Sequence, residues 1–445
     1  MQTVFTSSGG VPGRGGTTAE TLQFAVRIIA LLTIAGFVVY LVSGWVDSVP
    51  PAPPGVAATD NLAAAGVGVG EVHHNQGSGS KALPHKSLRR AAICTMTNPC
   101  KIQLIADLDE SSRDESQGKL TFFSYLQSGY LYRVSNRGGG FFSLGGSTES
   151  TSTSTAVNGS SDKGADGKEA SRPQAAPTYA VEWGASERVD GHHNEAGRGM
   201  ELSELLQFDN VLYTFDDRTG IVYELDTKKE GKASVYPRHI VTEGAGDTNK
   251  GMKIEWATQK DGNLWIGSFG KEYTNAKGEI VNENNMWVVA LGANGKMQRF
   301  NWKPAYDAVR RALGAPYPGY CIHEAVAWSD DMQKWVLLPR RVSSDPYDDE
   351  QDEYRGSNKL VLASEDFSQI EVREIGDIVP ERGYSSFAFI PGTDDQVIVA
   401  LKSVESAKTK TQSTYLSVFH INGDVYLPDT EVPGGYKYEG IEIIS

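Results

Sequence analysis

The chain is poor in the residues from which most metal and nucleophile sites are built. Its 445 residues include only three cysteines and eight histidines, too few and too scattered for a zinc site. No Gly-x-x-x-x-Gly-Lys-Ser/Thr loop is present, which excludes a P-loop phosphate cradle. His323-Glu324 lacks the second histidine of HExxH, and Phe387 replaces the last glycine of GxSxG after Gly383–Ser386. Asp107-Leu108-Asp109 lacks the later glycine and glutamate of an EF-hand loop.

Positive charge is also scarce. The 42 Lys and Arg residues stand against 56 Asp and Glu residues, which gives a formal net charge of −14. An acidic surface of this kind repels the phosphate backbone of nucleic acids, so we expect no nucleic-acid partner. A phosphate-bearing ligand would need a local group of basic residues or a metal ion to overcome the same repulsion.

One long apolar run is present, and it lies near the N-terminus. Residues 28–46 carry no charge and are long enough to span a bilayer. Arg14 and Arg27 precede the run, and the next Lys or Arg is Lys81. The positive-inside rule then predicts a cytosolic tail over 1–27, a transmembrane signal anchor over 28–46 and an external remainder. A cleaved signal peptide is the alternative.

Two segments lack the pattern of a folded core. Residues 47–100, rich in Pro, Gly, Ala and Ser, predict a flexible stem. Residues 145–177 predict a disordered loop insertion, and they contain the sequon at Asn158, which would be glycosylated in a secretory compartment. Cys94 and Cys100 either close a small disulfide loop in an oxidising compartment or remain free thiols.

Helical sequence is scarce as well, and Ala305–Leu313 is the best candidate for a short helix. From Lys101 to the end at residue 445, short β-branched and aromatic runs alternate with Asp-Gly, Asn-Gly and similar turns. This pattern is typical of an all-β sandwich, barrel or propeller. Without the insertion, the length fits five or six blades of about 40–60 residues each. Sequence repetition is too weak to exclude two β-sandwiches.

Oxygen-bearing side chains recur at roughly one per blade, each near the start of a predicted strand. Successive members are separated by 52, 69, 61 and 54 residues, and they are Ser203, Glu255, Glu324, Ser385 and Glu439. The innermost strand of each propeller blade lines the central channel, so equivalent positions would converge there. Three carboxylates and two further oxygen donors suit Ca²⁺ better than zinc. Taken singly, each residue is better explained as an ordinary exposed or capping residue.

A series of ordered motifs then points to a known family. Among them are IADLD (Ile105–Asp109), GRGMELSEL (Gly197–Leu205), LYTFDDRTGIVY (Leu212–Tyr223), PGYCIHEA (Pro318–Ala325), LLPRR (Leu337–Arg341) and KYEGIEII (Lys437–Ile444). From about Ile102 to Ile444, with the insertion set aside, the chain resembles the calcium-activated nucleotidases of the apyrase family.

The resemblance implies a five-bladed β-propeller with one Ca²⁺ in its central tunnel, held by the five residues of the recurring series. It also implies a substrate cleft at one mouth of the tunnel. The matching positions are Asp107, Asp109, Asp216, Arg218, Arg340 and Arg341 for catalysis, and Glu182, Lys271 and Glu272 for substrate binding. Arginine forks match phosphate oxygens, and Asp107 or Asp216 would orient or deprotonate the attacking water. Trp183 would stack a nucleobase or lie in the core.

We therefore expect a type II, lumen-facing, Ca²⁺-dependent hydrolase of nucleoside diphosphates, UDP and GDP above all, and of triphosphates as a further substrate, in the Golgi or ER. One alternative is a non-catalytic propeller that binds a glycan or protein and uses Ca²⁺ for structure. Another is a secreted apyrase that acts on extracellular ADP or ATP. The oligomeric state, monomer or homodimer, stays open.

Overall fold

The structure is a computed structural model that describes residues 94–116, 120–134, 178–227, 232–275, 279–406 and 408–444. All of them belong to one compact unit, 81–445. The expected cytosolic tail, signal anchor, most of the stem, and the insertion with its sequon lie outside the described residues. None of the helices within the described ranges has the length and apolar character that a membrane crossing requires.

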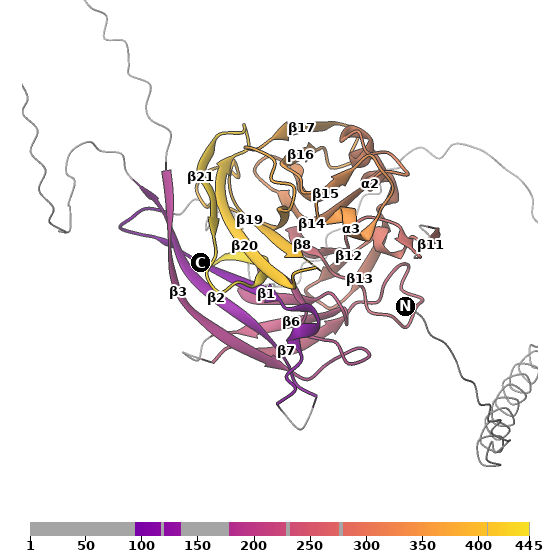
Figure 1. Cartoon of the computed structure of the whole chain (residues 1–445), viewed down its shortest axis with the longest axis horizontal. Coiled ribbons are helices and arrows are strands. Elements are labelled where there is room, and N and C mark those ends of the chain that lie inside the picture. Colours follow the sequence, from indigo (N-terminus) through magenta and orange to yellow (C-terminus); the bar gives the residue numbers. More distant parts are fainter. Residues whose placement is uncertain are drawn as a thin grey trace, which may run out of the picture. The chain divides into compact units, whose positions relative to one another are not determined.

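Five four-stranded antiparallel sheets make up the described part of the chain, together with the small hairpin of β10 (Tyr273–Thr274) and β11 (Ile280–Asn282) (Figure 1). From innermost to outermost strand, one sheet contains β22 (Lys437–Ile444), β1 (Cys100–Asp107), β2 (Phe122–Val134) and β3 (Thr178–Gly191), and the next contains β4 (Leu202–Phe208), β5 (Val211–Asp216), β6 (Ile221–Asp226) and β7 (Ser234–Ile240). The third sheet contains β8 (Trp256–Lys260), β9 (Asn263–Gly267), β12 (Trp287–Gly292) and β13 (Met297–Asn301), and the fourth contains β14 (Tyr320–Ser329), β15 (Lys334–Ser343), β16 (Lys359–Ala363) and β17 (Ile370–Glu374). The fifth sheet contains β18 (Gly383–Phe389), β19 (Val397–Ser406), β20 (Thr411–His420) and β21 (Val425–Glu431).

The five innermost strands form a closed ring. Contacts join β22 to β4, β4 to β8, β8 to β14, β14 to β18, and β18 back to β22. The last strand, β22, pairs with the first, β1, in the register Ile102 to Ile443 and Leu104 to Ile441. The two ends of the described chain therefore complete one blade together. The expected five-bladed β-propeller is confirmed.

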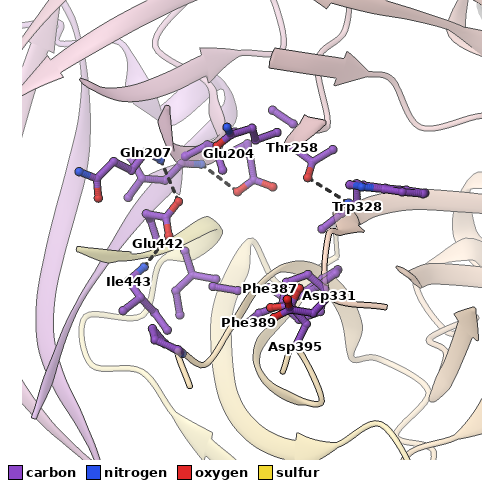
Figure 2. Close-up of a pocket in the computed structure, with 18 of the residues that line it drawn as sticks. Glu204, Gln207, Thr258, Trp328, Asp331, Phe387, Phe389, Asp395, Glu442 and Ile443 are labelled. Atoms are coloured by element: carbon purple, nitrogen blue, oxygen red, sulfur yellow. Dashed lines mark hydrogen bonds between the residues drawn. The ribbon is translucent and has the colours of Figure 1, made fainter. Parts of the chain in front are cut away.

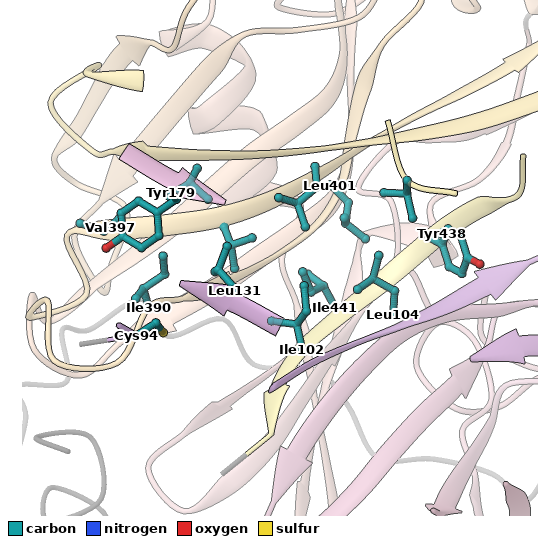
Figure 3. Close-up of a cluster of buried hydrophobic side chains, with 14 of the residues drawn as sticks. Cys94, Ile102, Leu104, Leu131, Tyr179, Ile390, Val397, Leu401, Tyr438 and Ile441 are labelled. Atoms are coloured by element: carbon teal, nitrogen blue, oxygen red, sulfur yellow. The ribbon is translucent and has the colours of Figure 1, made fainter. Parts of the chain in front are cut away.

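Blades pack face to face through aliphatic and aromatic side chains. One such cluster joins Ile102, Leu104 and Leu131 of the first blade to Leu401 and Val418 of the last (Figure 3). Strands in the middle of a blade are buried on both faces, as the nearly continuous burial of β15 and β19 shows. A strand covered on both sides reads in sequence as an unbroken apolar run rather than an alternating one.

Helices are few in the described part of the chain. The expected short helix is confirmed as α2 (Lys303–Ala312), which begins with a proline in its first turn, where the missing N–H costs nothing. The others are α3 (Asp349–Asp352) and the 3₁₀ turns η2 (Asp109–Ser112) and η3 (Asn284–Met286). Of the two alternatives for Cys94 and Cys100, the structure has the disulfide.

Gly440 lets two neighbouring inner strands approach closely. A Cβ atom at this position of β22 would lie 2.5 Å from the backbone of Glu204 and Leu205 in β4. That distance is far below van der Waals contact between backbone atoms. The inner ring can therefore close at this place only with glycine.

We predict that Gly440→Ala lowers the free energy of unfolding by about 1–3 kcal/mol, because the added methyl group forces β22 and β4 apart. Urea denaturation checks this. Gly184→Ala is the matched control, since a Cβ there meets Ser128 at an ordinary 3.5 Å. Equal stability of the two variants would contradict the close approach.

Candidate metal centre and phosphate cleft

Each of the five predicted metal ligands lies where the ladder of an innermost strand is irregular. The register slips by one residue at Ser203, Glu324, Ser385 and Glu439. Glu255 directly precedes β8, and its N–H donates to the carbonyl of Gly267, the residue that also pairs with Trp256. A bulge adds one unpaired residue and re-aims its side chain. Four of the five blades thus use a bulge, and in the fifth the ligand stands directly ahead of its strand.

Three of these residues converge on one point. One carboxylate oxygen from each of Glu255, Glu324 and Glu439 lies within 4.8 Å of the others, and all three side chains are buried. Burial, with repulsion from Glu324, raises the pKa of Glu255 to about 8 against the opposing effect of Lys253. Buried carboxylates this close need protons or cations. An all-oxygen set with three carboxylates fits Ca²⁺.

The two serines of the ring hold the glutamates in place. The Ser203 hydroxyl donates to the carbonyl of Ile254, and the Ser385 hydroxyl donates to the carbonyl of Tyr438 at 3.0 Å. Those carbonyls immediately precede Glu255 and Glu439, on neighbouring inner strands. Each serine therefore ties the next strand beside its glutamate, and its hydroxyl oxygen keeps a lone pair that could bind a metal ion.

A cavity of about 490 Å³ opens beside the three glutamates. Ten acidic and six basic residues line it, so basic groups gather here within an acidic chain. Five of the predicted cleft residues are among them, namely Asp107, Asp109, Lys271, Arg340 and Arg341. The cavity is large enough for a small-molecule ligand.

Two consecutive arginines of β15 serve different partners. Nη1 of Arg340 contacts the carboxylate of Glu324 and lies 2.6 Å from Oε1 of Glu439. Arg341 is only 2% exposed, yet its Nε and Nη1 have no hydrogen-bond partner among the described residues, and Asp352 is 3.7 Å away. Buried donors without a partner are rare. A guanidinium group with free donors at the wall of a cavity is suited to an oxyanion.

The pKa values of the Asp107 and Asp109 carboxylates are shifted in opposite directions. Asp107 Oδ2 lies 2.8 Å from Lys437 Nζ, and this lysine keeps the Asp107 pKa below its usual value despite burial. Burial and the neighbouring Asp107 charge raise the pKa of Asp109 to about 7. Asp109 also has φ of 47°, a region that residues other than glycine seldom occupy. Paired carboxylates with separated pKa values are typical of acid–base sites.

Asp216 and Arg218 do not line the cavity. The Asp216 carboxylate is fully buried beneath its turn and accepts hydrogen bonds from the N–H groups of Met200, Arg218 and Thr219, at 2.9, 3.0 and 3.1 Å. The next residue, Asp217, lines the cavity and contacts Lys253. The turn that carries Asp216 thus supplies a different carboxylate, that of Asp217, to the cleft.

The other three expected substrate contacts also lie elsewhere. Glu272 forms a double ion pair with Arg310 of α2, with both N···O distances at 2.9 Å. Glu182 and Trp183 lie on β3, the outermost strand of its blade. Glu182 accepts a hydrogen bond from the Tyr132 hydroxyl at 3.0 Å, and Trp183 packs against a hydrophobic core.

Several residues that line the cavity are not predicted from the sequence, among them Asp217, Lys253, Lys437 and Tyr347. The two lysines do carry a sequence signal. We call the converging Glu255, Glu324 and Glu439 the hub glutamates. Each lysine stands two residues before one of them, as Lys253-Ile254-Glu255 and Lys437-Tyr438-Glu439. Side chains at positions i and i+2 of an extended chain point to the same face, so each lysine accompanies its glutamate.

A second cavity, of about 200 Å³, is lined by residues further along the same inner strands (Figure 2). Every ionisable residue in its lining is acidic, namely Glu204, Asp209, Asp331, Asp394, Asp395 and Glu442. Glu204 of β4 accepts a hydrogen bond from Ser386 of β18 at 2.8 Å, although these strands are not neighbours in the ring. A polyanion would be repelled here, so of these two cavities the first is the candidate for phosphate chemistry.

Comparison with known proteins agrees with this geometry. The family model described as Apyrase matches residues 169–444. The chain belongs to the apyrase family. It is 41% identical over 345 residues to soluble calcium-activated nucleotidase 1 of Rattus norvegicus, covering 77% of this chain and 73% of that protein.

Two invertebrate apyrases are similarly related. The apyrase of Cimex lectularius is 41% identical over 267 residues, 59% of this chain and 71% of that one. Apyrase apy-1 of Caenorhabditis elegans is 44% identical over 254 residues, 57% of this chain and 70% of that one. The expected family resemblance is confirmed, and it makes this apyrase a hydrolase of nucleotide phosphates.

We predict that Asp216→Asn lowers the free energy of unfolding by about 1–3 kcal/mol, because the new NH₂ group faces buried backbone donors. Thermal or urea denaturation checks this. Asp209→Asn, at an exposed turn, is the control and should change stability by about 0.5 kcal/mol or less. Wild-type stability of Asp216→Asn combined with lost turnover would instead favour the catalytic role that the family resemblance implies.

Proposed function

We propose that this chain is a Ca²⁺-dependent hydrolase that releases phosphate from nucleoside diphosphates, UDP and GDP first, and from triphosphates, leaving the monophosphate. The observation that carries the proposal is a single cavity in which three buried hub glutamates stand beside Arg341, whose Nε and Nη1 have no hydrogen-bond partner among the described residues. Phosphoanhydride cleavage needs charge neutralisation and an aligned water molecule. The lining has basic side chains for the first task and carboxylates for the second.

Charge balance within the cavity supports a requirement for a divalent cation. Ten acidic residues against six basic ones leave the lining negative, and a diphosphate would be repelled. Glu255, Glu324 and Glu439, together with Ser203 and Ser385, would hold Ca²⁺. When bound, Ca²⁺ would offset part of this negative charge and supply a positive centre next to the phosphate.

Phosphate binding falls to the basic residues of the lining. Arg341 would donate its free N–H groups to oxygens of the terminal phosphate, since a guanidinium fork matches two phosphate oxygens at once. Arg340 would stand beside it, on the side of the glutamates. Fixed positive groups of this kind stabilise charge that develops on the transferred phosphoryl group.

Water activation falls to the pair Asp107 and Asp109. Asp109 would accept a proton from the attacking water, because a general base works best with a pKa near the operating pH. Asp107, held ionised by Lys437, keeps the Asp109 pKa high. The water oxygen then forms a bond to the terminal phosphorus as the anhydride P–O bond breaks, and the nucleotide leaves as the monophosphate. The earlier preference for Asp107 or Asp216 as base thus moves to Asp109.

The proposed location is the lumen of the secretory pathway, with 28–46 as a type II signal anchor and the propeller on the lumenal side. The disulfide between Cys94 and Cys100 supports an oxidising compartment. There the enzyme would remove the UDP that glycosyl transfer leaves. A secreted form that acts on extracellular ADP or ATP is the alternative, and N-terminal sequencing of the mature protein distinguishes the two.

We predict phosphate release from UDP and GDP in Ca²⁺ and its loss with chelator, measured alongside ADP and ATP. Glu324→Gln should lower kcat/KM by about 100-fold or more, because it removes one carboxylate from the hub. Glu371→Gln, on the outermost strand β17, is the control and should behave as wild type. No phosphate from any nucleotide in Ca²⁺ would favour a non-catalytic propeller that binds a glycan or protein.

We predict that kcat/KM rises about tenfold per pH unit below pH 7 and levels off above it, because Asp109 must lose its proton to act as base. Asp109→Asn should abolish this limb of the profile and most of the activity. Glu371→Gln should retain the wild-type profile. An unchanged pH profile in Asp109→Asn would assign the base to another residue.

A further inference from the structure

Lys253 occupies a position between the metal centre and the open cleft. Its Nζ lies 2.6 Å from Oε1 of Glu255 and also contacts the carboxylate of Asp217. The lysine side chain is 43% exposed and lines the cavity. Its ammonium group is therefore held by a hub glutamate on one side and faces the phosphate cleft on the other.

Lys437, in the second Lys-x-Glu motif, differs from Lys253 because it is buried and surrounded by carboxylates. It is only 5% exposed and lies within ion-pair distance of Asp107, Asp109, Glu439 and Glu405, at 2.8, 3.0, 3.6 and 3.7 Å. Four surrounding carboxylates hold its ammonium group in place. Lys253 has two carboxylate partners and a side chain that is 43% exposed, so the same motif gives a partly exposed cation in one blade and a buried cation in the other.

Resting on the function proposed above, we propose that Lys253 is an internal counter-ion of the metal site that couples metal occupancy to phosphate binding. In metal-free protein, Glu255 and Asp217 together retain the ammonium group. Once Glu255 serves as a metal ligand, Lys253 keeps only Asp217 and turns its remaining donors to a phosphate oxygen in the cleft.

The physical basis is competition for one carboxylate. A lysine within hydrogen-bond distance of Glu255 neutralises the charge that attracts a dication, and it repels the dication as well. Lys253 therefore weakens metal binding to the empty cleft. Phosphate, by drawing the ammonium group away from Glu255, lifts that penalty. The two ligands must then strengthen each other's binding by the same factor, because linkage is reciprocal.

Lys250 offers a matched control. It lines the same cavity and is 41% exposed, but its nearest carboxylate is Glu243 at 3.8 Å, outside the hub. Replacing Lys250 removes the same charge from the cleft without touching a hub glutamate. A difference between the two variants then reports on the contact with Glu255 and not on the overall charge of the cleft.

The test measures Ca²⁺ binding by calorimetry, first alone and then with a saturating non-hydrolysable methylene analogue of UDP. For wild type we expect the analogue to tighten Ca²⁺ binding about fivefold or more. Lys253→Met should bind Ca²⁺ alone about tenfold more tightly than wild type, and the analogue should then improve binding about twofold or less. Lys253→Arg should keep the wild-type values, because the charge is restored, and Lys250→Met should keep the wild-type ratio.

Unchanged or weaker Ca²⁺ binding by Lys253→Met, or a full wild-type ratio in that variant, would overturn the inference. So would the same loss of coupling in Lys250→Met. Absence of Ca²⁺ binding in the wild-type protein would instead contradict the proposed function, so the two failures are distinguishable. Should Lys253→Met fail to fold, Lys253→Gln gives the same comparison, with circular dichroism confirming the fold.

Discussion

Repulsion among three carboxylates at the axis is the constraint on which the rest of the site depends. Glu255, Glu324 and Glu439 come within 4.8 Å of one another in a buried position, and such a cluster is stable only when cations or protons accompany it. Lys253 and Arg340 supply that charge. Because both line the same cavity, the need to balance the hub is what brings basic groups to the mouth of the cleft.

The backbone has to be irregular for this cluster to form. A regular inner strand would pair every residue with its neighbour, whereas four of the ring positions are bulged out of the ladder and Glu255 stands just ahead of its strand. Glu439 comes from β22, which joins the blade that begins with β1. The proposed metal centre is therefore complete only when the two ends of the propeller sequence have closed the ring, which ties the site to the fold.

The propeller fold and the ring of five site residues could be predicted from the sequence. The site residues that could not be predicted were missed for physical reasons. The spacing from Ser203 to Glu439 was informative because one inner strand recurs per blade, so position along the chain maps to position around the axis. Asp216 and Asp217 could not be told apart, since a one-residue slip exchanges the two faces of a strand and the bulge at Ser203 introduces such a slip opposite Asp216. The partner of Glu272 is Arg310, far away in the sequence, and nothing local reveals it.

The two ends of the inner strands show how an acidic protein can accept an anionic ligand at one end and repel it at the other. The cavity further along the strands has acidic groups alone among its ionisable lining residues, whereas the cleft has six basic residues among ten acidic ones. The cleft by itself is still negative, so basic residues alone would not make it attractive to a diphosphate. Two additional positive charges from a bound dication would act where the opposing carboxylates are concentrated, in a buried setting where screening is weak. The charge of the cleft therefore supports the proposed requirement for a divalent cation.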